Sequence, residues 1–320
     1  MSTVEKLGLM LVALGIFAVV FVGILVIAAR FSGRVGERIQ AGSFVLPAVL
    51  FIIVGLIYPA LLTIRDSFVE DGSGGYGLQN YVDIFTQSAY LTVLKNTALW
   101  VILVPVLATA IGLVYAIVVD RSPWEKAAKA LVFLPMAISM VGASIIWKFV
   151  YEYKPSFRPQ IGVLNALLNA VGIEPRQFLL DIPMNTFFLI IVMVWIQAGF
   201  AMTILSAAIK AIPDDIIEAA KLDGVSGFRM FRYVTLPSVR PAVVVVLTTI
   251  AIATLKVFDI VYAMTGGQFE TSIIANEFYV QSFSRNDAGI GAALAVLLFV
   301  LVIPILIYNV RQMRLSEEQR

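Results

Sequence analysis

The stretch NTALWVILVPVLATAIGLVYAIVV, at residues 96–119, decides the fold class because it contains no charged residue. A helix rises about 1.5 Å per residue, so this stretch is long enough to cross the roughly 30 Å hydrocarbon core of a membrane. Comparable uncharged stretches occur at residues 7–29, 44–64, 182–209 and 288–310, and two more, at 130–150 and 241–264, carry charge only near one end. The sequence therefore predicts an all-α membrane protein with seven transmembrane helices.

The composition of the 320-residue chain supports the same class. Hydrophobic residues make up 60% of it and charged residues 14%, against roughly 25% charged residues in a soluble domain. This balance excludes a soluble globular protein, a disordered chain and a fibrous repeat. The chain contains no Cys and no His, so we expect no metal site, and the net charge of +2 indicates no binding of nucleic acid.

Two segments near the amino end imitate other signals. Residues 7–29 follow Glu5 and Lys6, but their apolar run is longer than that of a secretory signal peptide, so we expect a retained helix. The stretch GSGGYG at residues 72–77 formally matches the dinucleotide-binding fingerprint. No predicted strand precedes it, so we expect a flexible external turn instead.

The distribution of Lys and Arg predicts the orientation of the chain. One set of loops carries 14 of these residues and the opposite set carries 6. Loops rich in Lys and Arg face the cytoplasm, so we expect the amino terminus outside and the carboxyl terminus inside. None of the loops is long enough for a further folded domain.

The loop after the fifth predicted span has an unusual sequence, AIPDDIIEAAKLDG at residues 211–224. Pro213 with the two following aspartates favours a helix start and Gly224 favours a left-handed cap, so we expect a helix of about ten residues. Such a helix is too short to span a membrane. It could rest on lipid, but its acidic face would be repelled by anionic lipid, and the small Ala219–Ala220 surface would let another protein approach closely. The pattern favours docking to a cytoplasmic partner.

Three stretches resemble a known family. The residues EAA at 218–220 and DG at 223–224, followed by Pro237, resemble the EAA motif of permease subunits in binding-protein-dependent ABC importers. The stretch VFDIVYAMTGG at 257–267 resembles a signature of the carbohydrate-importer branch, and IQAGFAM at 196–202 is similar to the α-glucoside members.

The resemblance covers residues 44–314 and implies a six-helix permease core there, with the EAA loop at about 211–237 serving as a short cytoplasmic coupling helix. One extra transmembrane helix then lies within residues 1–43, and residues 315–320 form a cytoplasmic tail. The sequence departs from the family at Gln268-Phe269, where many sugar permeases carry Gly-Pro. This departure leaves the shape of the following external loop open.

What the resemblance implies is a pore-forming, non-catalytic subunit of an ATP-driven sugar importer in the inner membrane of a bacterium. The expected cargo is an oligosaccharide or an α-glucoside such as maltose or trehalose. The implied partners are a second related permease, a cytoplasmic ABC ATPase dimer and an external solute-binding protein. The chain has no GxxxxGK[ST] phosphate loop, so we expect no cofactor on it, with ATP and Mg bound by the ATPase.

The candidate site residues fall into two groups. The expected ATPase-coupling residues are Glu218, Ala219, Ala220, Asp223, Gly224 and Pro237. Polar residues inside predicted spans are functional candidates by default, and the expected substrate-path residues are Gln197, Phe200, Thr203, Lys256, Asp259 and Tyr262. Lys256 and Asp259 lie at i and i+3, so a single helix would place them on one face, either paired with each other or facing the solute. The three residues on the fifth span could contact sugar or serve helix packing.

Three alternatives remain open. The same machine could carry glycerol phosphate or another polyol, although a lone Lys256 beside Asp259 makes a poor anion pocket. A secondary transporter could use Asp259 as a proton carrier, but this leaves the helix around Glu218 without a role. An intramembrane enzyme would need a catalytic pair, and one buried carboxylate without His or Cys is poor material for it.

Overall fold

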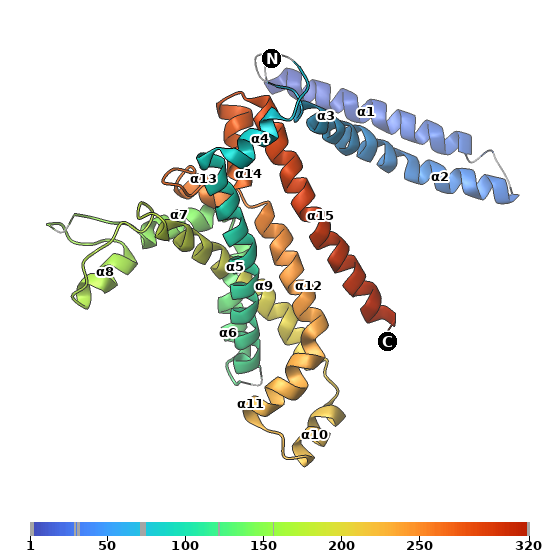
Figure 1. Ribbon diagram of the computed structural model, residues 1–320. Helices are drawn as coiled ribbons and strands as arrows, with labels where there is room; N and C mark the ends of the chain where they lie inside the picture. Colours follow the sequence, from blue (N-terminus) through green and yellow to red (C-terminus); the bar gives the residue numbers. More distant parts are fainter. Residues whose placement is uncertain are drawn as a thin grey trace. The chain divides into compact units, whose positions relative to one another are not determined.

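The computed structural model describes residues 3–28, 30, 33–70, 75–120, 122–155 and 157–318 (Figure 1). Clustering of contacts divides the chain into two compact units, Met1–Arg65 and Asp66–Arg320. The regular structure of the described residues is helical, apart from one isolated β-bridge between Val69 and Tyr76, which confirms the predicted all-α fold. Residues 71–74 of the predicted glycine-rich turn lie outside the described residues.

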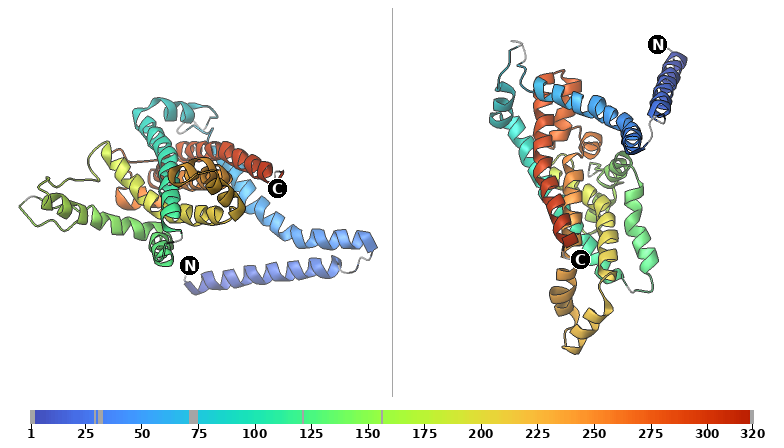
Figure 2. Two further views of the ribbon diagram at one scale, coloured as in Figure 1. Left: turned by 90° about the horizontal axis from the view of Figure 1, so that it is seen from below. Right: turned by 90° about the vertical axis from the view of Figure 1, so that its right-hand side faces the viewer.

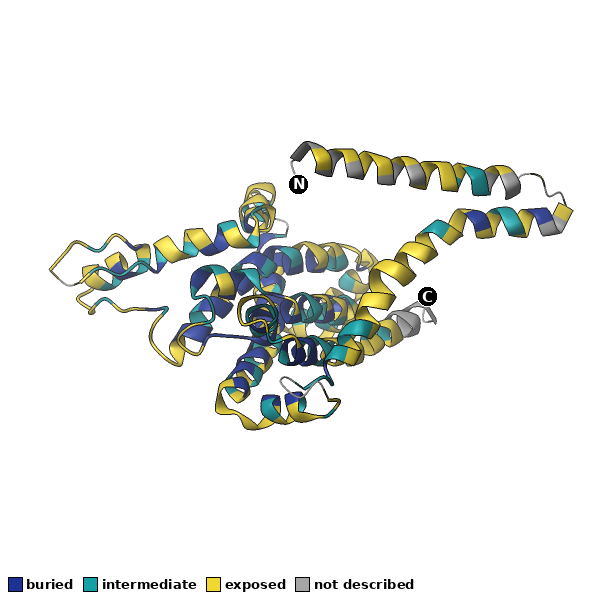
Figure 3. Ribbon diagram, turned by 90° about the horizontal axis from the view of Figure 1, so that it is seen from above, coloured by how far each residue is buried: buried dark blue, intermediate teal, exposed yellow. Residues whose placement is uncertain are grey.

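The first unit contains α1 (Thr3–Ala28), α2 (Gly33–Ile52), the π-helical turn η1 (Ile53–Ile57) and most of α3 (Tyr58–Asp66). α1 packs along α2, where the ring centroids of Phe17 and Phe51 lie 5.3 Å apart. Gly36–Asp66 forms one apolar helix that is long enough to cross a membrane, which confirms the predicted span at 44–64. Most of its large apolar residues are exposed, as the yellow parts of the ribbon in Figure 3 show, and this is typical of a helix that faces lipid.

The second unit is built around α5 (Ser88–Val119), α9 (Met184–Lys210) and α12 (Leu236–Leu255). α15 (Ala288–Glu318) packs against α12, and α4 (Gln79–Thr86) contacts both α5 and α15. α5 and α9 approach closely at Gly112, where an added Cβ would lie 2.6 Å from the Met202 backbone nitrogen. Small residues allow such an approach between membrane helices. α5, α9 and α15 confirm the predicted spans at 96–119, 182–209 and 288–310.

The predicted span at 130–150 is not a single helix, so that expectation is wrong. It consists of α6 (Glu125–Phe133), the 3-10 turn η2 (Leu134–Ala137) and α7 (Met140–Val150), with a bend of 105° between the two helices. Pro135 lacks the N–H of a helical hydrogen bond, and its ring crowds the preceding turn. Ser139 then caps α7, because its hydroxyl oxygen accepts a hydrogen bond from the Gly142 N–H at 3.0 Å.

The predicted span at 241–264 is interrupted as well. α12 ends at Leu255, and a new helix, α13 (Asp259–Met264), begins three residues beyond Lys256. No Gly or Pro marks this break. Instead, the Thr254 hydroxyl donates to the Ile250 carbonyl at 2.7 Å, an interaction that competes with the helical hydrogen bonds, and the Val257 side chain is buried in the core. α14 (Ile274–Tyr279) and the π-helical turn η4 (Val280–Ser284) then lead to α15.

Two further groups of short helices lie outside this core. α8 (Val163–Ala170) lies in the loop between α7 and α9. α10 (Asp214–Leu222), α11 (Gly227–Met230) and the π-helical turn η3 (Phe231–Thr235) connect α9 to α12. In Figure 1 they project beyond the lower ends of α6, α9 and α12, and the right-hand view in Figure 2 shows the same.

Among the described residues, five helices are long and apolar enough to cross a membrane, or six if the bent α6–α7 pair is one span. Met10–Ile24 forms a shorter apolar helix within α1. The count of seven spans stays a prediction.

Candidate functional site

The first candidate site is the projecting segment, residues 211–235. Its helix α10 begins directly after Pro213, with Asp214 and Asp215 in the first turn, where the helix dipole favours acidic side chains. It ends in a Schellman motif, because Gly224 has a φ of 76° and its N–H donates to the Lys221 carbonyl at 3.0 Å. The Val225 N–H donates to the Ala220 carbonyl at 2.9 Å, completing the motif. The predicted start and end of this helix are confirmed.

The projecting segment leaves apolar side chains outside the core of the second unit. α10 has no buried residue, and its Leu222 side chain is 89% exposed. On α11, Phe228 is 76% exposed. Of the predicted coupling residues, Ala220 is half-buried, and the exposed ones are Glu218, Ala219, Asp223, Gly224 and Pro237. Both large apolar side chains therefore lie exposed on the same projecting segment.

The second candidate site is the part of α9 that carries Gln197, Phe200 and Thr203. Gln197 and Phe200 are half-buried, and Phe200 packs against the hydrophobic core. Thr203 is exposed, and its hydroxyl donates to the Gly199 carbonyl of the preceding turn at 2.9 Å. Among the described residues, the structure gives the Gln197 side-chain amide no hydrogen-bond partner.

Lys256 and Asp259 do not share a helix face, and the expectation that they do is wrong. Lys256 is the exposed C-cap of α12, whereas Asp259 is half-buried at the start of α13. In the part of the chain that the structure describes, no ion pair joins them. Tyr262 on α13 is 47% exposed and stacks on Phe258 with ring centroids 4.8 Å apart. These side chains therefore lie on either side of a helix break.

We expect Lys256→Met to be tolerated without any compensating change at Asp259. Because the two side chains are not paired, removing one charge does not leave the other without its partner. We therefore expect Lys256→Met to have the same effect on membrane yield and melting temperature in two backgrounds, the wild-type protein and the Asp259→Leu variant. A rescue of Lys256→Met by the second change would contradict this separation.

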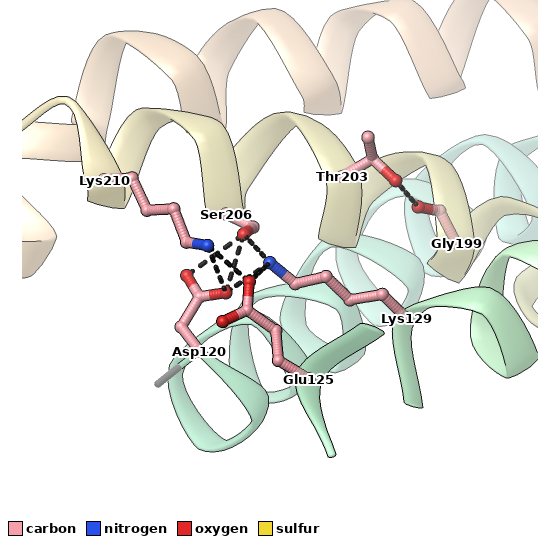
Figure 4. Close-up of polar contacts among 7 residues, drawn as sticks. All are labelled: Asp120, Glu125, Lys129, Gly199, Thr203, Ser206 and Lys210. Carbon is pink, nitrogen blue, oxygen red and sulfur yellow. Dashed lines mark hydrogen bonds and ion pairs between the residues drawn. The ribbon is translucent and has the colours of Figure 1, made fainter. Parts of the chain in front are cut away.

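A polar cluster at the end of α9 that leads into α10 was not predicted. It joins Asp120, the C-cap of α5, to Glu125 and Lys129 on α6 and to Ser206 and Lys210 on α9 (Figure 4). The Ser206 hydroxyl donates to the two Asp120 carboxylate oxygens at 2.8 and 3.0 Å and accepts a hydrogen bond from the Lys129 ammonium group. The Asp120 side chain is only 7% exposed.

Local signals for this cluster do exist in the sequence. Glu125 and Lys129 are spaced i and i+4, which favours an ion pair on one helix face, and the structure shows that pair at 2.8 Å. Asp120 and Ser206 are 86 positions apart, so no local spacing predicts their contact.

The loop that follows Gly267, whose shape the sequence left open, is held by buried amides. The Asn96 side-chain amide donates to the Glu270 carbonyl at 2.6 Å, and the Asn185 amide donates to the Phe269 carbonyl at 2.7 Å. Phe269 and Glu270 both adopt positive φ angles, 55° and 58°. A cavity of about 460 Å³ opens beside this loop, and its lining includes Tyr90, Glu270, Ser272, Glu277 and Arg285.

Within the described ranges, no three acidic side chains lie close enough together to hold a metal ion. The cluster around Asp120 is instead balanced by two lysines.

Comparison with known proteins identifies a family and several similar transport proteins. The family model described as "Binding-protein-dependent transport system inner membrane component" matches residues 88–314. The osmoprotective compounds uptake permease protein GgtC of Synechocystis is 44% identical over 87% of this chain and 100% of its own length. The alpha-glucoside transport system permease protein AglF of Rhizobium meliloti is 42% identical over 87% of this chain and 83% of its own length. A bacterial alginate ABC transporter chain, 21% identical, shares the fold with a TM-score of 0.74 over 87% of this chain and 96% of its own.

Proposed function

Because the chain belongs to the family of binding-protein-dependent transport system inner membrane components, as a permease subunit of a carbohydrate ABC importer, we propose that it forms half of a pore for α-glucosides. Permease subunits of this family are non-catalytic, and they lie in the inner membrane as multi-pass proteins. The proposed cargo is an α-glucosidic oligosaccharide of the maltose or trehalose type. The observation that carries this substrate class is the 42% identity to AglF, which extends along most of both chains.

The remaining parts of the importer follow from this proposal. A second related permease completes the pore, an external solute-binding protein delivers the sugar, and a cytoplasmic ATPase dimer binds ATP and Mg. The projecting segment faces the cytoplasm, which places the amino terminus outside and the carboxyl terminus inside. Residues 44–314 form the permease core, and α1 is an additional helix.

In this proposal α10 is the helix that docks to the ATPase. Its support is the combination of a capped helix with no buried residue and the exposed Leu222 and Phe228 side chains. The acidic groups Glu218 and Asp223 lie on the same segment as these apolar groups, and a partner with complementary positive charge could bind there specifically. A rigid end at Gly224 keeps the helix in one orientation for docking.

The direct test is reconstitution of the complete importer in proteoliposomes. We expect ATP-dependent accumulation of radiolabelled maltose or trehalose, and no accumulation of glycerol 3-phosphate. Uptake driven by a pH gradient without the ATPase would instead establish a secondary transporter. Uptake of glycerol 3-phosphate without uptake of either sugar would overturn the proposed cargo.

A second cargo class, an osmoprotective compound, is favoured by the 44% identity to the osmoprotective compounds uptake permease protein GgtC. We propose an uncharged polyol for this class, because its hydroxyl groups suit the same uncharged hydrogen-bonding side chains. Competition distinguishes them, because an excess of a polyol such as sorbitol should leave labelled maltose uptake unchanged if α-glucosides are the cargo.

We expect Gln197→Ala and Phe200→Ala to weaken sugar uptake while ATP hydrolysis stimulated by the binding protein is retained. Gln197 offers an amide for sugar hydroxyls and Phe200 an aromatic face, and a lost hydrogen bond to an uncharged group costs about 0.5–1.5 kcal/mol. The expected rise in the half-saturation constant for sugar is therefore roughly 2- to 12-fold. Phe188→Leu is a control, because Phe188 packs in the aromatic cluster around Tyr151 and Phe178. An unchanged half-saturation constant in both test variants would remove these residues from the path.

A further inference from the structure

The polar cluster around Asp120 lies where the projecting segment leaves the core. Lys210 is the last residue of α9, and α10 begins at Asp214. The Lys210 ammonium group pairs with Glu125 on α6 and lies 4.0 Å from an Asp120 carboxylate oxygen. One turn earlier on α9, Ser206 bonds to both Asp120 and Lys129. The last two turns of α9 are therefore tied to α5 and α6 immediately before the chain enters α10.

Packing already holds these helices together above the cluster. Gly199 lets α6 approach α9, since an added Cβ would lie 2.5 Å from the Val132 carbonyl oxygen, and Gly112 does the same between α5 and α9. A buried ion pair adds little net stability compared with apolar side chains of similar size, although it does select one geometry. The cluster is thus not needed to assemble the helices, and what it supplies is a fixed position of α9 relative to α5 and α6.

Because the polar cluster holds α6 to α9, the connection of α6 to the next helix matters. α6 continues through η2 into α7 with a bend of 105°, so a displacement of α6 also moves α7. A cavity of about 340 Å³ beside the cluster is lined by Lys129, Phe133, Met202, Thr203 and Ser206. This space lets the side chains around the cluster rearrange when α9 shifts.

We infer that Asp120, Lys129 and Ser206 are positioning residues that carry movement of α10 to α5 and α6. This inference rests on the proposed docking of α10 to the ATPase. When the ATPase displaces α10, the cluster makes the ends of α5, α6 and α9 move together. Without the cluster, α10 still docks and ATP is still hydrolysed, but the movement no longer reaches the bent α6–α7 pair, so less sugar is moved for each ATP.

The test uses the complete importer in proteoliposomes, with maltose uptake and ATP hydrolysis measured on the same sample. Lys129→Met alone strands the buried Asp120 carboxylate, so the informative variant is the neutral pair, Asp120→Asn with Lys129→Met. We expect this double variant to reach the membrane and co-purify with the ATPase at wild-type levels, while maltose moved per ATP falls about tenfold. The conservative pair, Asp120→Glu with Lys129→Arg, keeps both charges beside Glu125 and Lys210 and should recover most of that ratio. A wild-type ratio in the neutral pair would overturn the inference.

Two further variants complete the design. If the neutral pair does not accumulate in the membrane, Ser206→Ala is the informative variant. It removes the hydroxyl that joins α9 to Asp120 and leaves both charges in place. An unchanged amount of maltose moved per ATP in this folded variant overturns the inference as well. Lys154→Met is the matched control, since it breaks the half-buried Glu152–Lys154 pair of 2.9 Å in the loop after α7, and it should keep the wild-type ratio. A separate variant tests the proposed docking itself. If α10 does not dock to the ATPase, Glu218→Lys should leave co-purification of the ATPase intact.

Discussion

Replacing Gly224 by valine is expected to abolish ATP-driven sugar uptake while the permease still inserts in the membrane. The residue has a φ of 76°, in the left-handed region that a side chain disfavours by about 1–2 kcal/mol, and more when the side chain is β-branched. An added Cβ meets no neighbour within 4 Å, so we expect the main effect to be on the backbone of the α10 cap. Loss of the Schellman motif leaves α10 without its rigid end, and co-purification of the ATPase should fall together with uptake.

Gly172 offers a matched control for this substitution. It follows α8, has a φ of 79° and also has open space around its Cβ position. Gly172→Val therefore imposes the same local strain at a site far along the chain from α10, and we expect it to keep ATPase binding and uptake. Equal losses in the two variants would show that strain alone, and not the α10 surface, explains the Gly224 result.

The second large effect is expected at Gly112, where Gly112→Ala should destabilise the packing of α5 on α9. The new Cβ would lie 2.6 Å from both the Ala201 Cβ and the Met202 backbone nitrogen, so backbone atoms of α9 must shift. Overpacking of this kind costs about 1–3 kcal/mol. The checks are the melting temperature of the detergent-solubilised protein and its yield in the membrane, both of which should fall.

Gly23→Ala serves as the comparison for Gly112. Gly23 lies inside α1 with nothing within 4 Å of its Cβ position, so the same change adds a methyl group without a clash. Alanine is also the better helix former by about 1 kcal/mol. We expect the melting temperature to stay the same or rise. A Gly112→Ala protein as stable as Gly23→Ala would mean that the close approach of α5 and α9 can relax without cost.

Much of the helical framework could be predicted from uncharged runs, because the membrane imposes a strong and simple constraint on length and polarity. The runs at 96–119, 182–209 and 288–310 correspond to α5, α9 and α15. The ends of α10 were predictable for a different reason, since Pro213 and Gly224 act through their own backbone preferences. In both cases the decisive interaction is local.

The breaks in the predicted spans at 130–150 and 241–264 were harder to predict, and each has its own cause. Pro135 is a local signal at the bend between α6 and α7. The break after Leu255 has no Gly or Pro, and it depends on the burial of Val257 in contacts made by distant parts of the chain. The error at Lys256 and Asp259 follows directly, since a face can be inferred from spacing only if the helix is continuous.

The polar cluster shows the same limit for the candidate site. The Glu125–Lys129 pair was available from its spacing, but Asp120 and Ser206 meet only because α5 and α9 pack side by side. Contacts between such distant positions depend on the three-dimensional arrangement, which the local pattern of one sequence does not contain.

The absence of buried residues in α10 has a thermodynamic consequence. A helix of nine residues is marginal in water by itself, and in proteins its stability comes mainly from an apolar face buried against other elements. In the proposed importer, the ATPase covers that face. In the isolated permease, the amide hydrogens of α10 should therefore exchange with solvent faster than those of α5 or α9, at a rate set by local opening and not by global unfolding. The helix gains its full protection only in the assembled importer, which makes hydrogen exchange at α10 a direct measure of assembly.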